Sequence, residues 1–231
     1  MDPGTDYSDA IAERVRAAAE AGTPLAIRGG GSKACYGHPV EGEALDLAPH
    51  RGVLHYAPTE LMMTARAGTP LDELEERLAD NGQMLAFEPP RFTADTTIGG
   101  AVAAGLSGPR RPFSGAVRDH VLGVRIVRGD GTVERFGGEV IKNVAGYDVA
   151  RLSVGALGTL GVLLDVSFKV LPVAETSRTV CLELPLGRLY DRVERATRHG
   201  APITGAAHDG ERAWIRLCGA ASAVDAGAED L

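Results

Sequence analysis

The sequence predicts an α+β protein of two domains, and three of its features support this class. Residues 8–82 alternate between helical and strand patterns. Residues 121–136 have the pattern of two β-strands joined by Gly129-Asp130-Gly131, which is a strong hairpin signal. After Pro172, residues 175–219 follow the order strand, helix, strand, strand, so they predict a second, smaller domain.

The first elements follow from the spacing of apolar residues and from helix-ending residues. Residues 8–21 place apolar side chains on one helical face, and we expect Ser8 to cap this helix and Gly22 to end it. Short strands are then predicted at residues 25–28, 44–47, 53–56 and 61–67. A second helix is expected from Pro70, because proline suits the first helical position, and it should stop at Asn81-Gly82.

Residues 86–118 form a long irregular stretch, and loops of that length in compact domains are usually functional. Within it, residues 99–104 are small enough to form a short helix. Two interpretations of this helix remain open: its N-terminal N–H groups face an anionic ligand, or its small residues allow close packing on a sheet.

The last predicted elements complete the two domains. A long strand at residues 162–171 closes the first domain. The second domain is expected to contain strands at residues 179–184, 203–207 and 213–217 and a helix at residues 189–198. Residues 220–231 are small and acidic, so a flexible tail is expected there.

Composition excludes several classes of protein. A length of 231 residues with 44% hydrophobic content predicts a globular protein with one large or two small cores. The net charge of −7 and the scattered arginines argue against nucleic acid as a partner. No run reaches the ~18 apolar residues that a membrane span needs, and the acidic start is not a signal peptide. We therefore expect a cytoplasmic protein.

The cysteines and histidines predict no metal site. The three cysteines are widely spaced, which argues against a disulfide framework or a zinc knuckle, and we expect Cys181 and Cys218 to be buried thiols in strands. His199 and His208 lie nine residues apart with no third clustered ligand, so locally satisfied side chains are favoured over metal ligands. A structural role is also expected for the isolated histidines His38, His50, His55 and His120.

The most informative segment is Arg28-Gly29-Gly30-Gly31-Ser32-Lys33, which follows an apolar strand. Successive glycines allow positive φ and let several N–H groups converge, so the segment predicts a nest for phosphate oxygens. A Rossmann fingerprint is unlikely here, because Gly37 and Pro39 would break the helix that it must open. The chain also contains no Gly-Lys pair followed by Ser or Thr, which a P-loop requires. An ordinary glycine-rich turn remains the alternative.

Glycine-rich segments recur along the chain, notably at residues 99–108 and 155–161. Separated by strands, they suggest that backbone approaches one extended ligand at several places. A simple phosphate would not need so many segments, whereas a dinucleotide would.

From Pro24 to about Pro172 the chain resembles flavoproteins of the vanillyl-alcohol oxidase (PCMH) type, and within them the FAD-binding subunits of bacterial glycolate oxidases, or glycolate dehydrogenases. Two runs are long and specific, GQMLAFEPP at residues 82–90 and LSGPRRP at residues 106–112. Shorter matches lie at residues 68–71, 98–100, 136–140, 142–148 and 158–162. The resemblance implies an FAD-binding domain at residues 1–174, with subdomains of about 1–57 and 58–174, and then a short, incomplete cap at residues 175–219.

The resemblance also implies roles for individual residues towards FAD. Arg28, Gly29, Gly30, Gly31, Ser32 and Lys33 resemble the pyrophosphate loop. Gly99, Gly100, Ser107 and Gly108 resemble the segment along the ribityl chain and the flavin. Lys142, Asn143 and Gly146 resemble a loop near the cofactor, and Gly161 and Val162 the backbone that meets the adenine. The predicted cofactor-binding residues further include Gly37, Pro89 and Thr97. Non-covalent FAD is implied, because Ser32 and Lys33 stand where some relatives carry the histidine that links the flavin.

What the resemblance implies about function is a subunit of a multi-subunit enzyme that oxidises glycolate to glyoxylate. Its partners would be a second flavin-bearing subunit and an iron–sulfur subunit, through which the complex could associate with a membrane. No residue is identified as the catalytic base, and the cap is about a hundred residues shorter than is usual in the family, as a truncation or as a natural short form. Two alternatives remain open: a free-standing FAD-dependent dehydrogenase of D-lactate or a similar D-2-hydroxy acid, and a non-catalytic assembly subunit.

Overall fold

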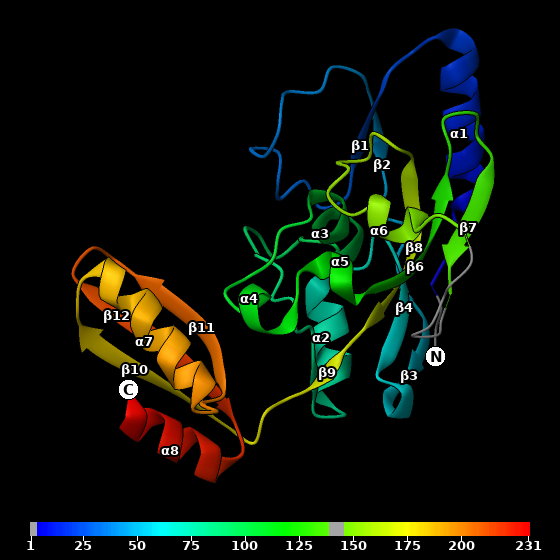
Figure 1. Cartoon of the computed structure of the whole chain (residues 1–231). Coiled ribbons are helices and arrows are strands. Elements are labelled where there is room, and N and C mark those ends of the chain that lie inside the picture. Colours follow the sequence, from blue (N-terminus) through cyan, green and yellow to red (C-terminus); the bar gives the residue numbers. More distant parts are fainter. Residues whose placement is uncertain (1–3, 139–145) are drawn as a thin grey trace. The chain divides into compact units, whose positions relative to one another are not determined.

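The computed structural model of the chain describes residues 4–138 and 146–231, which divide into two compact units (Figure 1). Unit 1 comprises Met1–Leu85, Pro89–Leu106 and Ala116–Leu171. Unit 2 comprises Ala86–Glu88, Ser107–Gly115 and Pro172–Leu231. Both units mix helices with sheets, so the expected α+β class is confirmed.

Unit 1 is built on a five-stranded sheet and two short strand pairs. Its helices are α1 (Ser8–Ala21), the 3₁₀ turn η1 (Pro58–Glu60), α2 (Leu71–Ala79), α3 (Ile98–Ala104), α5 (Val117–His120) and α6 (Val149–Leu152). Its strands are β1 (Leu25–Arg28), β2 (Glu43–Asp46), β3 (Val53–Ala57), β4 (Met62–Arg66), β5 (Gln83–Met84), β6 (Val121–Val127), β7 (Val133–Gly137) and β8 (Val162–Lys169). β1 and β2 pair in parallel, and an antiparallel five-stranded sheet has the order β3-β4-β8-β6-β7. The expected hairpin is confirmed as β6 and β7, and β9 (Leu171–Pro172) pairs with β5.

The helices of unit 1 form where apolar spacing and turn residues predict them. α1 ends at Gly22, which adopts a left-handed φ of 64°. Ser8, however, is the first residue of α1 rather than its cap, and its N–H donates to Oδ1 of Asp6. α2 begins directly after Pro70 and buries three leucines on one face, so its packing rests on the expected spacing.

The hydrophobic core of unit 1 includes a cluster between α1, the β1–β2 pair and the strands β6 and β8. Its members are Ile11, Ala12, Val15, Leu45, Leu47, Val127, Val162 and Leu164. Burial of these apolar side chains, at about 25 cal/mol per Å² of area removed from water, stabilises the end of β1 from which the glycine run departs.

The five-stranded sheet has one polar face, which follows from the two-residue periodicity of its strands. Register places Ala65 of β4 beside Val166 of β8 and, one residue on, Arg66 beside Asp165. Asp165 is buried and forms an ion pair of 2.6 Å with Nε of Arg125 on β6. The buried His50 lies 3.6 Å from Asp165, and Asp6 lies 3.5 Å from Arg66. Charged residues therefore hold the N-terminal segment to this sheet.

Unit 2 is a three-stranded antiparallel sheet with helices packed on it. Its elements are α4 (Arg111–Ser114), β10 (Thr176–Glu183), α7 (Leu186–Arg198), β11 (Ile203–His208), β12 (Arg212–Gly219) and α8 (Ala221–Asp230), and the strand order is β10-β12-β11. Leu189 of α7, Val224 of α8 and Ile215 of β12 belong to one buried cluster. The predicted β-α-β-β order is confirmed.

The structure corrects two expectations about unit 2. Residues 221–230 form α8 rather than a flexible tail, because Val224 buries its side chain in the unit's core even though the segment is mostly small and acidic. Cys181 and Cys218 do lie in strands, but Cys181 is exposed and Cys218 is only partly buried. Cys181 belongs to the edge strand β10, and Cys218 lies among polar side chains rather than in the apolar cluster.

The long irregular stretch at residues 86–118 contains two short helices, α3 and α4, and the start of a third, α5. None of the helices within residues 4–138 and 146–231 is long and apolar enough to cross a membrane.

Candidate cofactor site

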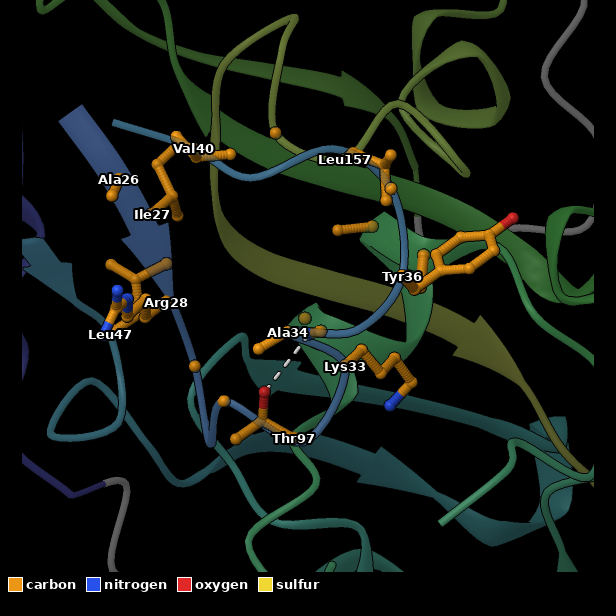
Figure 2. Close-up of a pocket in the computed structure, with 18 of the residues that line it drawn as sticks. Ala26, Ile27, Arg28, Lys33, Ala34, Tyr36, Val40, Leu47, Thr97 and Leu157 are labelled. Atoms are coloured by element: carbon orange, nitrogen blue, oxygen red, sulfur yellow. Dashed lines mark hydrogen bonds between the residues drawn. The ribbon is translucent and has the colours of Figure 1, made fainter. Parts of the chain in front are cut away.

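A cavity of about 530 Å³ lies in unit 1, beside the run Gly29–Lys33 that we call the glycine loop (Figure 2). β1 leads into the loop, and α3 and the segment around Leu157–Gly161 supply further walls. The predicted cofactor residues that line it are Arg28, Gly29, Gly30, Gly31, Ser32, Lys33, Gly37, Thr97, Gly99, Gly100 and Gly161.

The remaining predicted residues do not line this cavity. Pro89 and Gly146 lie outside its lining, and Val162 is buried in the apolar cluster beside it. Ser107 and Gly108 belong to unit 2. Lys142 and Asn143 lie outside the described residues. The cavity therefore brings together the predicted pyrophosphate loop and the start of α3, but not the whole predicted set.

The glycine loop lies directly on the backbone of residues 95–97. A Cβ added to Gly30 would lie 1.5 Å from the carbonyl oxygen of Asp95, and one added to Gly29 would lie 2.4 Å from Oγ1 of Thr97. Real Cβ atoms essentially never approach other heavy atoms closer than 3.0 Å. Gly29 and Gly30 are therefore required by the packing of two loops, and not by the ligand alone.

Gly31 has a different reason to be glycine. Its φ is 68°, in the left-handed region, and a Cβ there would meet nothing within 4 Å. A single left-handed residue in a glycine-rich turn is the geometry from which backbone N–H groups converge on an anion. At this position the conformation, and not the available space, selects glycine.

α3 starts at the cavity, and close packing on the sheet accounts for its glycine at Gly99, while the interpretation that its N-terminal N–H groups face an anion stays a prediction. Oγ1 of Thr97 accepts a hydrogen bond of 3.2 Å from the N–H of Gly100, so Thr97 caps the helix. A Cβ on Gly99 would lie 2.5 Å from Cβ of Ala67, just after β4. The small residues therefore let α3 approach the sheet closely, and Gly99 and Gly100 also line the cavity.

Two cations line the cavity without a carboxylate partner among residues 4–138 and 146–231. No ion pair of the described residues includes Arg28 or Lys33, although this acidic chain has many others. Nζ of Lys33 donates to Oγ of Ser32 at 3.4 Å. Burial lowers the pKa of the Lys33 amine below its usual value of 10.5, because desolvation disfavours the charged form. An anionic ligand would supply the missing counter-charge.

The other side of the cavity is apolar. In Figure 2 the side chains of Ile27, Val40 and Leu157 lie on one side, and Lys33 and Thr97 on the other. Val40 is 67% exposed and Tyr36 is 47% exposed. Large apolar side chains that remain exposed inside a cavity suit a ligand that has an apolar or aromatic part.

Leu157 has an unusual backbone for a leucine, with a φ of 53°. Its N–H donates to the carbonyl of Ala103 at 2.9 Å, and the N–H of Gly155 donates to Val102 at 3.0 Å, so this segment is held along α3. Left-handed non-glycine residues cost roughly 1–3 kcal/mol and cluster at functional sites. Sequence reasoning found the glycines of this segment but gave no signal for Leu157.

His38 also lines the cavity and is exposed, whereas a structural role was expected for it. The histidines of unit 2 behave as expected. Nε2 of His208 lies 2.8 Å from the Leu184 carbonyl, and its Nδ1 accepts from the N–H of Gly210. His199 lies 3.0 Å from Asp230. Within residues 4–138 and 146–231 there is no group of three or more His, Cys, Asp or Glu residues that could hold a metal ion.

Gly108 has a role within unit 2, where a Cβ would lie 2.6 Å from Cβ of Glu88. Glu88 has a φ of 46° and accepts from Arg216 at 2.7 Å and from the N–H of Arg110 at 2.9 Å. Cys218 adjoins this network. Desolvation raises the pKa of its thiol, but hydrogen bonds with Ser177, Thr204 and Arg110 outweigh that effect, so the pKa lies below its usual value.

Comparison with known proteins identifies the ligand of this family. The family model described as "FAD binding domain" matches residues 6–137. The chain is 49% identical over 226 residues to glycolate oxidase subunit GlcE of Escherichia coli, an alignment that covers 98% of this chain and 65% of the relative. It is 30% identical over 201 residues to glycolate oxidase subunit GlcD of Bacillus subtilis, covering 86% of this chain and 41% of that protein. It is 27% identical over 179 residues to a D-lactate dehydrogenase of Archaeoglobus fulgidus, covering 77% and 40%.

A solved structure shares the fold. Alkyldihydroxyacetonephosphate synthase superposes with a TM-score of 0.72 at 18% identity, over 94% of this chain and 46% of that chain. The expected vanillyl-alcohol oxidase type of fold and FAD as the cofactor are thereby confirmed. The chain spans about two thirds or less of the length of the relatives that it matches.

Proposed function

Because the chain belongs to the FAD-binding domain family, we propose that it is the FAD-binding subunit of an enzyme that oxidises glycolate to glyoxylate. The observation that carries this proposal is the 49% identity to glycolate oxidase subunit GlcE over nearly the whole chain, together with a cavity whose glycine loop suits a diphosphate. In this proposal unit 1 binds FAD, and unit 2 is the reduced cap.

The residues of the cavity fit FAD. The glycine loop leaves room for phosphate oxygens at Gly31, where a side chain would meet nothing within 4 Å. Arg28 and Lys33 supply two positive charges for a diphosphate, and Ile27, Val40 and Leu157 supply an apolar wall for an aromatic ring. When bound, FAD accepts a hydride from the substrate, and the protein mainly binds and orients the reactants.

We propose that the FAD is held without a covalent bond. The residues that directly follow the three glycines are Ser32 and Lys33, at the place where some members of the resembled family carry the histidine that links the flavin. Backbone N–H groups and the two cations would then be the main binding groups.

We further propose that a second flavin-bearing subunit oxidises the substrate, and that this chain supports electron transfer towards an iron–sulfur subunit in a cytoplasmic complex. Similarity to proteins named as glycolate oxidase subunits supports a heteromeric assembly. The histidines of unit 2 are occupied by local hydrogen bonds, as His208 shows at both ring nitrogens. Since proton transfer by a positioned side chain is worth roughly 10² to 10⁴ in rate, a subunit in which no catalytic base is identified should oxidise the substrate slowly.

A second candidate function is a free-standing dehydrogenase of D-lactate or a similar D-2-hydroxy acid. The similarity to a D-lactate dehydrogenase over 77% of this chain favours it. It differs from the first proposal in one measurable way, because the isolated chain would turn over its substrate.

The test is anaerobic mixing of the FAD-loaded chain with glycolate, and separately with D-lactate, while the visible flavin band is followed. We expect negligible bleaching by the isolated chain and rapid bleaching by glycolate once the partner subunits are co-expressed. Rapid bleaching of the isolated chain would favour the free-standing dehydrogenase. Purified protein that takes up no flavin would instead indicate an assembly subunit and refute both catalytic proposals.

A further inference from the structure

Phe92 is an exposed aromatic residue on the segment that supports the glycine loop. It is 56% exposed, and the centroid of its ring lies 5.8 Å from Nζ of Lys33. A cation within about 6 Å of an aromatic centroid is attracted by the negative face of the ring. The ring therefore contacts one of the two cations of the cavity that have no carboxylate partner among the described residues.

The segment that carries Phe92 is firmly anchored. The neighbouring Arg91 forms ion pairs with Asp72 and Glu75 of α2. A few residues later, Asp95 and Thr97 lie so close to the glycine loop that only glycines fit opposite them. Phe92 is thus attached to a framework whose position relative to the glycine loop is determined on both sides.

Lys33 itself has little else to hold it. Within residues 4–138 and 146–231 its amine makes one hydrogen bond, the 3.4 Å contact with Oγ of Ser32, and four rotatable bonds leave a lysine amine free to move. An ammonium that is already placed and partly desolvated loses less entropy and less hydration when an anion binds it. An aromatic ring can hold the ammonium in place without neutralising its charge, which stays available for an anionic ligand. A carboxylate in the same place would neutralise that charge.

We propose that Phe92 is a positioning residue that holds the Lys33 ammonium at the cavity, where it pairs with the diphosphate of FAD. The inference rests on the proposed function, because it takes FAD as the ligand of this cavity. It adds Phe92, which lies outside the glycine loop, to the cofactor site, and it assigns the diphosphate of FAD as the group that Lys33 binds.

The proposal implies a pH dependence with a definite sign. A diphosphate stabilises the ammonium, so the pKa of Lys33 is higher with FAD bound than without it. FAD affinity is then constant below the pKa of the free protein and falls as the pH rises from that value towards the pKa of the complex. Among the described residues the Lys33 amine contacts the Ser32 hydroxyl and the Phe92 ring, neither of which titrates in that range. The titratable side chains of Tyr36 and His38 also line the cavity, and the variant Lys33→Arg, which keeps both, separates their effect from that of Lys33.

The experiment measures the FAD dissociation constant between pH 7 and 10 for the full chain and for variants. Phe92→Leu should weaken binding about two- to fivefold, as expected for a cation–π contact at an exposed site. It should also move the alkaline loss of affinity to lower pH, because the ammonium loses the attraction of the ring and deprotonates more readily. Phe92→Tyr should behave like the parent, because it keeps the aromatic face. Lys33→Met should weaken binding about tenfold or more, as for a hydrogen bond to a charged group, and Lys33→Arg should bind without the alkaline loss.

Matched controls separate a local effect from a general one. Tyr190→Leu removes another exposed aromatic side chain, and Lys169→Met removes another lysine; both should leave FAD affinity unchanged. Lys33→Arg also controls for ionisation of FAD itself, since any alkaline loss that it retains does not come from Lys33.

The outcomes distinguish this inference from the proposed function. Equal affinity and equal pH profiles for Phe92→Leu and the parent would overturn the inference while leaving FAD binding intact. Equal weakening by Phe92→Leu and Phe92→Tyr would also overturn it, because the ring would then matter only for the shape of the loop. A parent chain that binds no FAD would refute the proposed function first.

Discussion

Gly30→Ala tests whether the glycine loop is a binding element or an ordinary turn. The added Cβ would lie 1.5 Å from the Asp95 carbonyl oxygen, so about 1.5 Å of movement is needed before the contact reaches 3.0 Å. Both partners are backbone, so neither can rotate away as a side chain would. The loop and the segment at residues 95–97 must separate.

The magnitude follows from the hydrogen bonds that this movement removes. A hydrogen bond to a charged group contributes about 1.5–3 kcal/mol, so the loss of two N–H contacts with a phosphate weakens FAD binding by ~100-fold or more. Gly31→Ala should cost less, about tenfold, because its Cβ meets nothing within 4 Å and only the left-handed φ of 68° opposes it.

The assay is titration of the flavin-free protein with FAD, followed by fluorescence, with circular dichroism to verify the fold. Gly82→Ala is the matched control, since Gly82 has a φ of 59° and open space but lies outside the cavity. It should lose some stability and no FAD affinity. If Gly30→Ala bound FAD as tightly as Gly31→Ala does, the two-loop packing would have no part in the site.

Three further predictions concern the polar sheet face and the state of the flavin. Asp165→Ala should lower the free energy of unfolding by about 3 kcal/mol, at the lower end of the range for a broken buried ion pair because Arg125 is partly exposed. Urea denaturation measures this loss, with Asp9→Asn at an exposed position as the control, and an unchanged midpoint for Asp165→Ala would contradict the prediction. The hydrogen bond from Ser8, with Arg125 and Arg66 nearby, lowers the pKa of Asp6 to about 2, so its contribution to stability is complete above pH ~4 and is lost as the pH falls towards 2. Asp6→Asn should therefore flatten the dependence of the urea midpoint on pH over that range, and parallel curves for variant and parent would count against it. Acid precipitation should release all of the flavin, since Ser32 and Lys33 directly follow the three glycines where a linking histidine would stand, and flavin that stays with the washed pellet would show a covalent bond.

Local patterns predicted much of the secondary structure. α1, α2 and the β6–β7 hairpin lie where apolar spacing, proline and glycine place them, because these signals act over a few residues. α8 was missed because its helix depends on burial of Val224 in the core of unit 2, which no local pattern reveals. The cysteines were misplaced for a similar reason, since strand periodicity shows which residues share a face but not what covers that face.

The sequence by itself determined the family, the cofactor and the glycine loop, since the glycine runs and the long specific runs at residues 82–90 and 106–112 are local features of the chain. Only the tertiary structure decided why each glycine is needed. A Cβ at Gly30 would clash with the Asp95 carbonyl and one at Gly99 with Ala67, whereas Gly31 has a left-handed φ that other residues rarely adopt. It also decided that Arg28 and Lys33 have no carboxylate partner among the described residues and that the ring of Phe92 lies beside Lys33. These contacts join residues that are far apart along the chain, and their distances depend on how loops pack, which spacing along one segment does not encode.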